Sequence, residues 1–390
     1  MKTILLAGIA VLLCTSTQAF AQDTYEEFLR QRQQELDARM AERDAGIFQS
    51  EEEYVQYAEE QQRQFDNFRD EMTRQWGDFK ERTESNWVEY RQGGKVRWDV
   101  DFEEGGGTVE VLADENDTEE SLRESIEETI LELLASKGTE SEMPDTENEK
   151  EVMPDPILEN QIELPADMGV QEFAKKTAEK AEMKKVVSED GVEKTIAVIN
   201  LKLVPDHLRI RAEKFRNEVE IYSKKYGLEP ALVFAIIHTE SFFNPLAKSH
   251  ANALGLMQVV PNSAGRDVYR ILNGKDAVPS VEYLYDPEQN VLYGSTYFDL
   301  LMNRYMRGVK DKTVHEYLVI CAYNTGAGNV AKAYTGTTNF NKALDKINSM
   351  SAEENYQFLL KNLPWDETKN YLVKVTDHRD KYRKWMAGSD

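Results

Sequence analysis

The first long pattern in the chain is a polar segment with widely spaced apolar residues, which is typical of exposed helices. Residues 24–91 are rich in Glu, Gln and Arg, and their only glycines are Gly46 and Gly77. Apolar side chains recur every three or four residues, as in a helix with one buried face; they are Phe65, Phe68, Met72, Trp76 and Phe79. The spacing predicts a helical arm over residues 22–92. The arm either packs on its own domain or acts as a coiled coil that binds a partner protein, and the lack of sustained heptads favours the first.

An alternating pattern follows and predicts a β-hairpin with one buried face. Four apolar residues alternate with charged ones before the glycines 105–107 and a second alternating run. Alternation with a period of two places these residues on the same side of a strand. They are Val96, Trp98, Val100 and Phe102.

A helix and a further strand complete a small α+β domain, predicted at residues 93–204. The helix opens around Thr118 and repeats Leu122, Ile126, Ile130 and Leu134 every four positions, so it can cover the sheet. Residues 136–168 are acidic, contain prolines and lack periodicity, which predicts a disordered excursion. Residues 193–207 predict a strand that pairs with the hairpin across this excursion.

The pattern changes again at residue 205 and predicts an all-α domain over residues 205–390. Helical segments follow one another, separated by short loops with Gly, Pro or Asn, and no run alternates like a strand. The predicted fold is therefore an α+β N-terminal domain with a long helical arm, followed by an all-α domain.

The first residues predict a cleaved secretory signal peptide, residues 1–21. Lys2 precedes an apolar run from Ile4 to Leu13, and Ala19-Phe20-Ala21 has the small-x-small pattern of a cleavage site. The run is shorter than the roughly 20 residues of a membrane span. A small residue precedes a cysteine that becomes lipidated, so Leu13 before Cys14 argues against a lipid anchor. Cys321 then remains alone, which predicts a buried apolar side chain and no internal disulfide.

Charge is divided unevenly along the chain. The net charge is −24 overall, and it is −27 for residues 1–200 against +3 for residues 201–390. The acidic half excludes binding to nucleic acid or anionic lipid, whereas the nearly neutral half can approach an anionic polymer. None of the five histidines has the spacing of a metal-binding motif, so we expect no metal and no other cofactor.

Glu240 is the main candidate for chemistry. A helix is predicted to begin at Pro230, to bury the run that follows, and to end before Asn244-Pro245, which leaves Glu240 in the last turn. Apolar neighbours and the negative end of the helix dipole both raise the pKa of a carboxyl group there. On these residues alone, Glu240 is either a general acid or a structural residue.

Four motifs carry a resemblance to a known family. In chain order they are ESFFNPLAKSHANALGLMQVVPNSAG, YDPEQNVLYGSTYF, CAYNTGAGNV and DETKNYLVKV. Together they resemble the transglycosylase domain of the lytic murein transglycosylases, the bacterial relatives of goose-type lysozyme. The hairpin RWDVDFEEGGGTVEVLA and the segment LVPDHLRIRAEKF resemble the membrane-bound lytic murein transglycosylase C subfamily. The resemblance implies a lysozyme-like fold for residues 205–390, peptidoglycan glycan strands as the substrate, a periplasmic location and association with the outer membrane.

The resemblance also implies residue roles. Glu240 corresponds to the single catalytic glutamate of the family, and Tyr323 to the tyrosine that approaches it. The implied substrate contacts are Ser249, Met257, Gln258, Tyr323, Asn324, Glu367 and Tyr371. Structural alternatives stay open, since Gln258 can bond a loop backbone, Tyr323 can be a core residue and Glu367 can cap the last helix. Gly255, Gly326 and Gly328 either allow backbone to approach a sugar or form ordinary turns.

A single catalytic carboxylate bears on the mechanism, because glycosidases typically use two. The substrate can replace the second one, since its 2-acetamido carbonyl can stabilise positive charge at C1. The resemblance then implies that Glu240 first acts as an acid and later as a base toward the C6 hydroxyl, which closes a 1,6-anhydro ring without water. Two alternatives remain: hydrolysis of the same bond by water, and a catalytically silent cell-wall-binding scaffold.

Overall fold

The computed structural model describes residues 47–138, 143, 152–188 and 191–388. Residues from Phe48 onward belong to one compact unit. The predicted signal peptide, residues 1–21, and the predicted arm up to residue 46 lie outside the described residues. The short strand β1 (Ile47–Phe48) begins the described chain, and every later element belongs to this unit.

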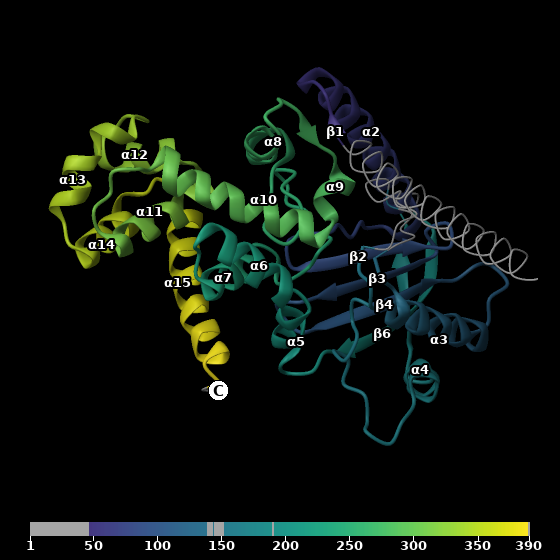
Figure 1. Cartoon of the computed structure of the whole chain (residues 1–390). Coiled ribbons are helices and arrows are strands. Elements are labelled where there is room, and N and C mark those ends of the chain that lie inside the picture. The colour runs from purple at the N-terminus through teal and green to yellow at the C-terminus, as the bar shows by residue number, and fades with distance from the viewer. Residues whose placement is uncertain (1–46, 139–142, 144–151, 189–190, 389–390) are drawn as a thin grey trace, which may run out of the picture. The chain divides into compact units, whose positions relative to one another are not determined.

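A five-stranded antiparallel sheet forms the core of the N-terminal half, with strand order β2-β3-β4-β6-β5 (Figure 1). Its strands are β2 (Asn86–Arg91), β3 (Val96–Asp101), β4 (Gly106–Leu112), β5 (Glu182–Val187) and β6 (Glu193–Lys202). The predicted hairpin is confirmed as β3 and β4, in which Val96 lies opposite Val111. The predicted pairing of the later strand with the hairpin is also confirmed, because β6 pairs with β4.

Helix α2 (Glu51–Trp76) is the described part of the predicted arm, and it packs on this sheet. Phe65, Met72 and Trp76 are buried against Val88 and Tyr90, so the apolar stripe is used within the domain and is not offered to a partner protein. The arm prediction is wrong beyond Trp76. Gly77 ends the helix with a left-handed φ of 82°, and the chain then enters β2.

The second face of the sheet is covered by α3 (Glu119–Ala135). Thr118 is its N-cap, as predicted, and its Oγ1 accepts a hydrogen bond from the Ser121 N–H at 3.1 Å. Since helices cover both faces, the prediction of one buried face is wrong. On the α2 side, Arg97 is buried, bonds Glu110 at 2.5 Å and lies 4.1 Å from the Trp76 ring centre.

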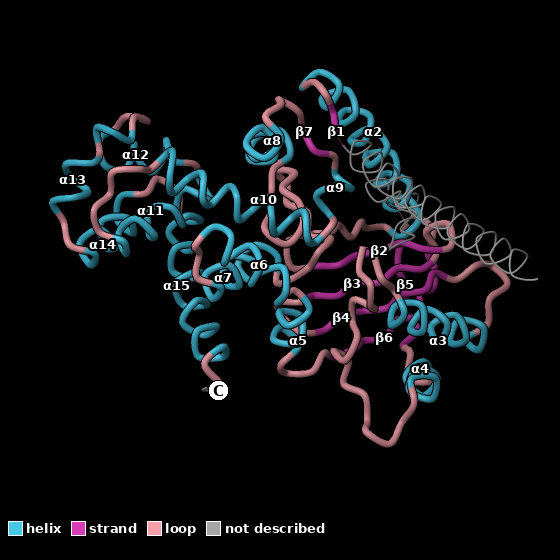
Figure 2. Tube along the Cα trace, in the orientation of Figure 1, coloured by secondary structure: helices cyan, strands magenta, loops and turns pink. Residues whose placement is uncertain are grey.

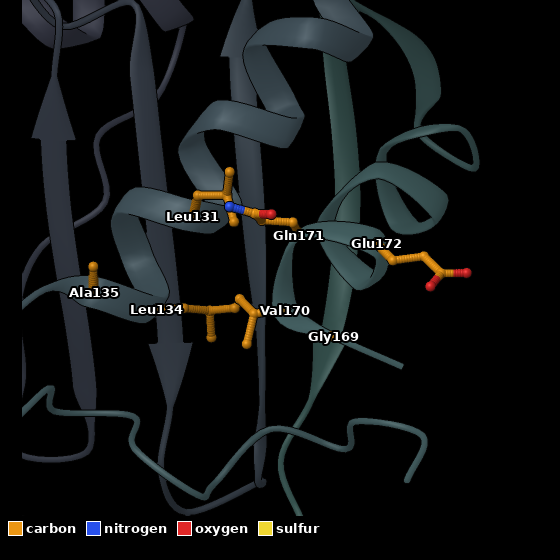
Figure 3. Close-up of a pocket in the computed structure, with 7 residues that line it drawn as sticks. All are labelled: Leu131, Leu134, Ala135, Gly169, Val170, Gln171 and Glu172. Atoms are coloured by element: carbon orange, nitrogen blue, oxygen red, sulfur yellow. The ribbon is translucent and has the colours of Figure 1, made fainter. Parts of the chain in front are cut away.

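Helix α4 (Val170–Ala178) packs beside α3. The two helices border an open cavity of about 570 Å³, around which Leu131, Leu134 and Val170 lie (Figure 3). Leu134 is therefore only partly buried, and Leu133 takes the buried position in the last turn of α3.

The predicted disordered excursion is wrong for residues 152–168. Ile157, Leu158 and Gln161 are buried there, Ile162 forms a β-bridge with Leu203, and the Lys214 Nζ donates to the Pro156 carbonyl at 2.7 Å. A few apolar residues anchor this segment although its overall composition is polar. Residues 139–142 and 144–151 lie outside the described residues.

From His207 onward the described chain is almost entirely helices and loops, as predicted (Figure 2). The helices are α5 (His207–Lys214), α6 (Arg216–Tyr226), α7 (Pro230–Ser241), α8 (Arg266–Asn273), α9 (Val281–Tyr285), α10 (Pro287–Leu300), α11 (Lys312–Thr325), α12 (Ala327–Thr335), α13 (Leu344–Ser349), α14 (Ala352–Asn362) and α15 (Asp366–Met386). Single helical turns occur at η2 (Pro261–Gly265), η3 (Leu301–Tyr305) and η4 (Phe340–Lys342). The one strand described here, β7 (Val278–Pro279), has two residues and was not expected from the pattern. None of the described helices combines the length and apolarity needed to cross a bilayer.

Candidate active site

The site is built around the C-terminal end of α7, a helix whose apolar run is buried and along which α15 packs. Pro230 occupies the first turn and the helix ends at Ser241, so Glu240 lies in the last turn as predicted. Phe242 and Phe243 then adopt left-handed conformations, with φ of 50° and 59°. Bulky residues rarely adopt this conformation, so the surroundings must stabilise the turn.

Arg211 of α5 provides that support. It is buried and donates to the Phe242 carbonyl at 3.0 Å, to the Phe243 carbonyl at 2.7 Å and to Gln161 Oε1 at 3.1 Å. Its guanidinium lies 3.4 Å from the ring centre of Phe102, at the end of β3. Four distant segments therefore meet behind the catalytic turn. The sequence analysis missed Arg211, because its local pattern is that of any basic residue on a helix.

Glu240 is partly buried, and its carboxyl accepts a hydrogen bond from the Tyr371 hydroxyl at 2.6 Å. Desolvation by burial raises the pKa of Glu240 to about 8, and the negative charges of Glu84 and Glu367 act in the same direction. The hydrogen bond from Tyr371 lowers the pKa but does not outweigh burial. The predicted rise of the pKa is confirmed, and Glu240 is protonated at neutral pH.

Two tyrosines from different helices lie near Glu240. Tyr371 comes from α15 and bonds the carboxyl, whereas Tyr323, from α11, donates to the Met257 carbonyl at 2.8 Å. Burial, followed by the charge of Glu240, raises the pKa of both hydroxyls well above the usual range. The tyrosine bonded to the carboxyl is thus Tyr371, although the resemblance points to Tyr323 for this contact.

The loop after α7 is held by a residue that the sequence analysis did not single out. Asn290 of α10 accepts from the Met257 N–H at 2.7 Å and donates to the carbonyls of Leu254 and Leu284 at 2.8 and 2.6 Å. Gly255 has a φ of 71°, and a Cβ there would lie 2.3 Å from the Asn290 amide nitrogen. The glycine is therefore required for this contact.

The predicted substrate residues of this loop make backbone contacts in the structure. Ser249 Oγ accepts from the N–H groups of Ala251 and Ala253 at 3.2 and 3.1 Å. The Gln258 amide donates to the carbonyls of Ala247 and Gly255 at 3.2 and 2.9 Å, which is its structural alternative. Its Oε1 is buried and has no hydrogen-bond partner in the described chain.

Met257 differs from its prediction. Its side chain is completely buried, and a Cβ added at Gly294 would lie 2.4 Å from its sulfur. The prediction that this side chain lines a saccharide groove is wrong, because it fills the space that Gly294 leaves on α10. Its backbone carbonyl still accepts from Tyr323.

Asn324 and Glu367 form a pair at the ends of α11 and α15. The Asn324 amide donates to Glu367 Oε1 at 3.1 Å, and the Thr368 hydroxyl donates to Asn324 Oδ1 at 2.7 Å. No side chain caps the start of α15, so the capping alternative for Glu367 is not observed. The structure thus gathers Glu240, Tyr323, Tyr371, Asn324 and Glu367 from α7, α11 and α15.

The N-terminal half also contributes to this region. Asn86, at the start of β2, accepts through its carbonyl from the Asn244 amide at 3.4 Å, and Glu84 lies two residues before it. Glu84 is close enough to raise the pKa of Glu240. The sequence analysis placed no functional residue in this segment, because it was assigned to the helical arm.

Burial keeps three other ionisable groups of this region uncharged. His238 stacks on His378 with ring centres 3.7 Å apart, and burial is the main cause that lowers their pKa values to about 2 and about 4. Cys321 is buried, as predicted, and burial raises the pKa of its thiol. Among the described residues, no group of three or more His, Cys, Asp or Glu side chains could hold a metal ion.

Comparison with known proteins gives matches along most of the chain. Residues 217–346 match the family described as "Transglycosylase SLT domain", and residues 54–214 match "Membrane-bound lytic murein transglycosylase C, N-terminal domain". The protein named membrane-bound lytic murein transglycosylase C from Pectobacterium atrosepticum is 35% identical over 292 residues, covering 74% of this chain and 80% of that protein. The protein of the same name from Klebsiella pneumoniae is 36% identical over 292 residues, covering 74% of this chain and 79% of that protein.

Among solved structures, the 70 kDa soluble lytic transglycosylase SLT70 from Escherichia coli is similar to part of this chain. It is 24% identical, and the match covers 46% of this chain and 26% of that chain with a TM-score of 0.35.

Proposed function

The chain belongs to the membrane-bound lytic murein transglycosylase C family, and from this premise we propose that it cleaves the β-1,4 bond between N-acetylmuramic acid and N-acetylglucosamine in peptidoglycan without using water. One observation carries the proposal for the mechanism. Glu240, held protonated with a pKa of about 8, accepts a hydrogen bond from Tyr371. A carboxyl group with these neighbours suits a residue that gives up a proton and later takes one back.

In the first step, protonated Glu240 donates its proton to the glycosidic oxygen, and the C1–O bond breaks. The 2-acetamido carbonyl of the muramic acid supports the positive charge that develops at C1. The Tyr371 hydroxyl stabilises the Glu240 carboxylate that exists between the two steps.

In the second step, the Glu240 carboxylate accepts the proton of the C6 hydroxyl, and this oxygen bonds to C1. A 1,6-anhydro ring forms and Glu240 is protonated again. The proton that Glu240 gave to the glycosidic oxygen is thus replaced by the C6 hydroxyl proton, and no water is consumed. The proposed substrate contacts around Glu240 are Ser249, Gln258, Asn324, Glu367 and the backbone carbonyl of Met257.

The test compares wild type with Glu240→Gln on purified murein sacculi, with muropeptides analysed by mass spectrometry. Wild type is expected to release fragments with 1,6-anhydro ends. The variant is expected to keep its circular dichroism spectrum and to lose activity by about 100-fold or more, since it cannot transfer the proton. Reducing ends would support hydrolysis instead, binding without cleavage would support a scaffold, and wild-type turnover by the variant would refute the assignment of Glu240.

The proposed location is the periplasm, after removal of residues 1–21. The relatives carry "membrane-bound" in their names, which supports a location at the cell envelope. Intact-mass measurement of the protein from envelope fractions tests this proposal: a chain beginning at Gln22 without lipid supports release, and a lipid-modified chain beginning at Cys14 supports an anchor.

A further inference from the structure

A second cavity opens on the C-terminal half, away from the bond to Tyr371. It has a volume of about 610 Å³. One wall is η3 and the residues after it, and the other is the segment from Ala327 to Asn341. The polar residues that line it include Asn303, Arg304, Tyr305, Arg307, Asn339 and Asn341.

The charge of these walls differs from that of the whole protein. The chain has 71 acidic residues, yet residues 300–310 and 317–344 contain none. The cations in these segments are Arg304, Arg307, Lys310, Lys332 and Lys342. The Asp299 carboxylate beside this wall accepts a hydrogen bond from the Asn303 amide at 2.6 Å, so it already has a partner, and the cations of the walls can take the carboxylates of a ligand.

The two arginines are exposed and unpaired within the described chain. Neither Arg304 nor Arg307 forms an ion pair with a described carboxylate, whereas most arginines of the chain do. The nearby Asp267 is engaged elsewhere, because it accepts from the Tyr305 hydroxyl at 3.0 Å and pairs with Arg270 at 3.3 Å. Arginine binds carboxylates bidentately, so each of these side chains can take one carboxylate of a ligand.

The remaining lining suits a peptide better than a simple ion. Asn303 donates to Asp299 at 2.6 Å and Asn339 Oδ1 accepts from the Asn341 N–H at 3.1 Å. The remaining polar atoms of these amides and the Asn341 amide can bond a peptide backbone, and the Tyr305 ring is 39% exposed. The volume lies within the roughly 300–1,000 Å³ of pockets that hold small organic ligands.

Both walls are connected to the active site. Ala327 follows Tyr323 by four residues, so their Cα atoms lie within about 15 Å of each other. On the other wall, α10 continues directly into η3, and its Tyr297 lies 5.7 Å from Tyr323 between ring centres. The two walls are therefore continuous with the helices that carry Tyr323 and Tyr297.

We propose that this cavity binds the carboxylate-bearing stem peptide of peptidoglycan, with Arg304 and Arg307 as its carboxylate contacts. The inference rests on the proposed function, since it places the peptide of the same substrate whose glycan lies at Glu240. The two arginines are specificity-determining residues and take no part in bond cleavage.

The test uses the full protein with two substrates, sacculi bearing stem peptides and glycan strands freed of peptides by an amidase. The variant Arg304→Ala/Arg307→Ala is compared with a control that removes two exposed charges elsewhere, Lys361→Ala/Lys384→Ala. We expect kcat/KM on peptide-bearing sacculi to fall about tenfold or more in the arginine variant, with no change on peptide-free strands or in the control. In a Glu240→Gln background, calorimetry with the synthetic peptide L-Ala-γ-D-Glu-diaminopimelate-D-Ala is expected to show binding that the two arginine substitutions abolish.

The outcomes separate the two proposals. If wild type cleaves neither substrate, the proposed function fails. If wild type cleaves both and the arginine variant matches it on both, or loses activity equally on both, the peptide assignment is overturned while the function stands. Arginine-dependent binding to phosphatidylglycerol vesicles in place of the peptide would overturn it in favour of a membrane contact.

Discussion

A carboxyl group that gives up a proton and later takes it back is tuned by neighbours that act in opposite directions. The Tyr371 hydroxyl lowers the pKa of Glu240, whereas the charge of Glu84 raises it. In the proposed mechanism activity requires protonated Glu240, so activity is expected to fall as the pH rises through about 8. Tyr371→Phe should therefore move this upper limb of the kcat/KM profile to higher pH, and Glu84→Gln should move it to lower pH. Profiles measured on sacculi check this, and shifts in the same direction would contradict it.

The raised pKa of Glu240 also affects folding stability. Between the ordinary pKa of 4.5 and about 8, the folded chain binds this proton more tightly than the unfolded chain. The stabilisation is fully present below the lower value and is lost as the pH rises through the upper one. Glu240→Gln should thus unfold like wild type in acid, and above pH 8 it should be more stable by up to about 5 kcal/mol. Urea unfolding at both pH values measures this, and equal stabilities in alkali would argue against a buried carboxylate.

The position of a residue could be predicted where neighbouring residues in the sequence determine it. The start of α7 at Pro230 and its end before Asn244-Pro245 are local signals, and they placed Glu240 correctly. Tyr371 lies 131 residues away, and its bond to Glu240 depends on how α15 packs along α7. Glu84 and Arg211 carry no local signal at all, because their importance arises only when the two halves of the chain meet.

Among the elements, the turn after α7 depends on α5 through one side chain. Arg211→Lys keeps the charge but loses the forked donors to the carbonyls of Phe242 and Phe243. We expect a loss of about 2–4 kcal/mol in unfolding free energy, because buried carbonyls lose their partners, and a fall in kcat. Arg209→Lys, two residues away, is the matched control, since Arg209 is exposed and pairs with Asp206. Equal urea midpoints for both variants would contradict this role.

The loop between α7 and η2 depends on a close approach to α10. Gly255→Ala combines a strained backbone, with φ at 71°, and a clash with the Asn290 amide. Gly274→Ala, at the end of α8, has a similar φ of 67° but open space around the new methyl group. We expect losses of about 3–5 kcal/mol for the first and about 1 kcal/mol for the second. Thermal unfolding of both variants separates clash from strain, and equal losses would show that the Asn290 contact is unimportant.

Elements with a clear period were predicted, and those without one were not. The hairpin β3–β4 and the cap at Thr118 followed from alternation and from turn residues. Strand β2 is buried on both faces, so it shows no alternation, and strand β5 is an exposed edge strand with the sequence EMKKVV. Burial on two faces, or on none, removes the period from which a strand is recognised.

For the whole molecule, side-chain contacts cross the predicted boundary near residue 205. Across it, Arg211 contacts Phe102 and Gln161, Lys214 bonds Pro156, and Asn244 bonds Asn86. These contacts surround the turn that follows Glu240. They could not be predicted from the sequence, because the polar composition of residues 152–168 indicated disorder. The sheet and the excursion therefore act as part of the support of the active site.

This support leads to a prediction for truncated chains. A chain of residues 205–390 leaves Arg211 as a buried charge without Gln161 and exposes the surface that Phe102 covers. A chain of residues 48–390 keeps all of these contacts. We expect the longer chain to unfold in one transition and to cleave sacculi like the full protein, and the shorter chain to unfold at a lower temperature with a reduced kcat, because the turn after Glu240 loses its backing. Calorimetry and muropeptide release compare the two, and equal unfolding temperatures and rates would mean that residues 205–390 hold the catalytic turn unaided.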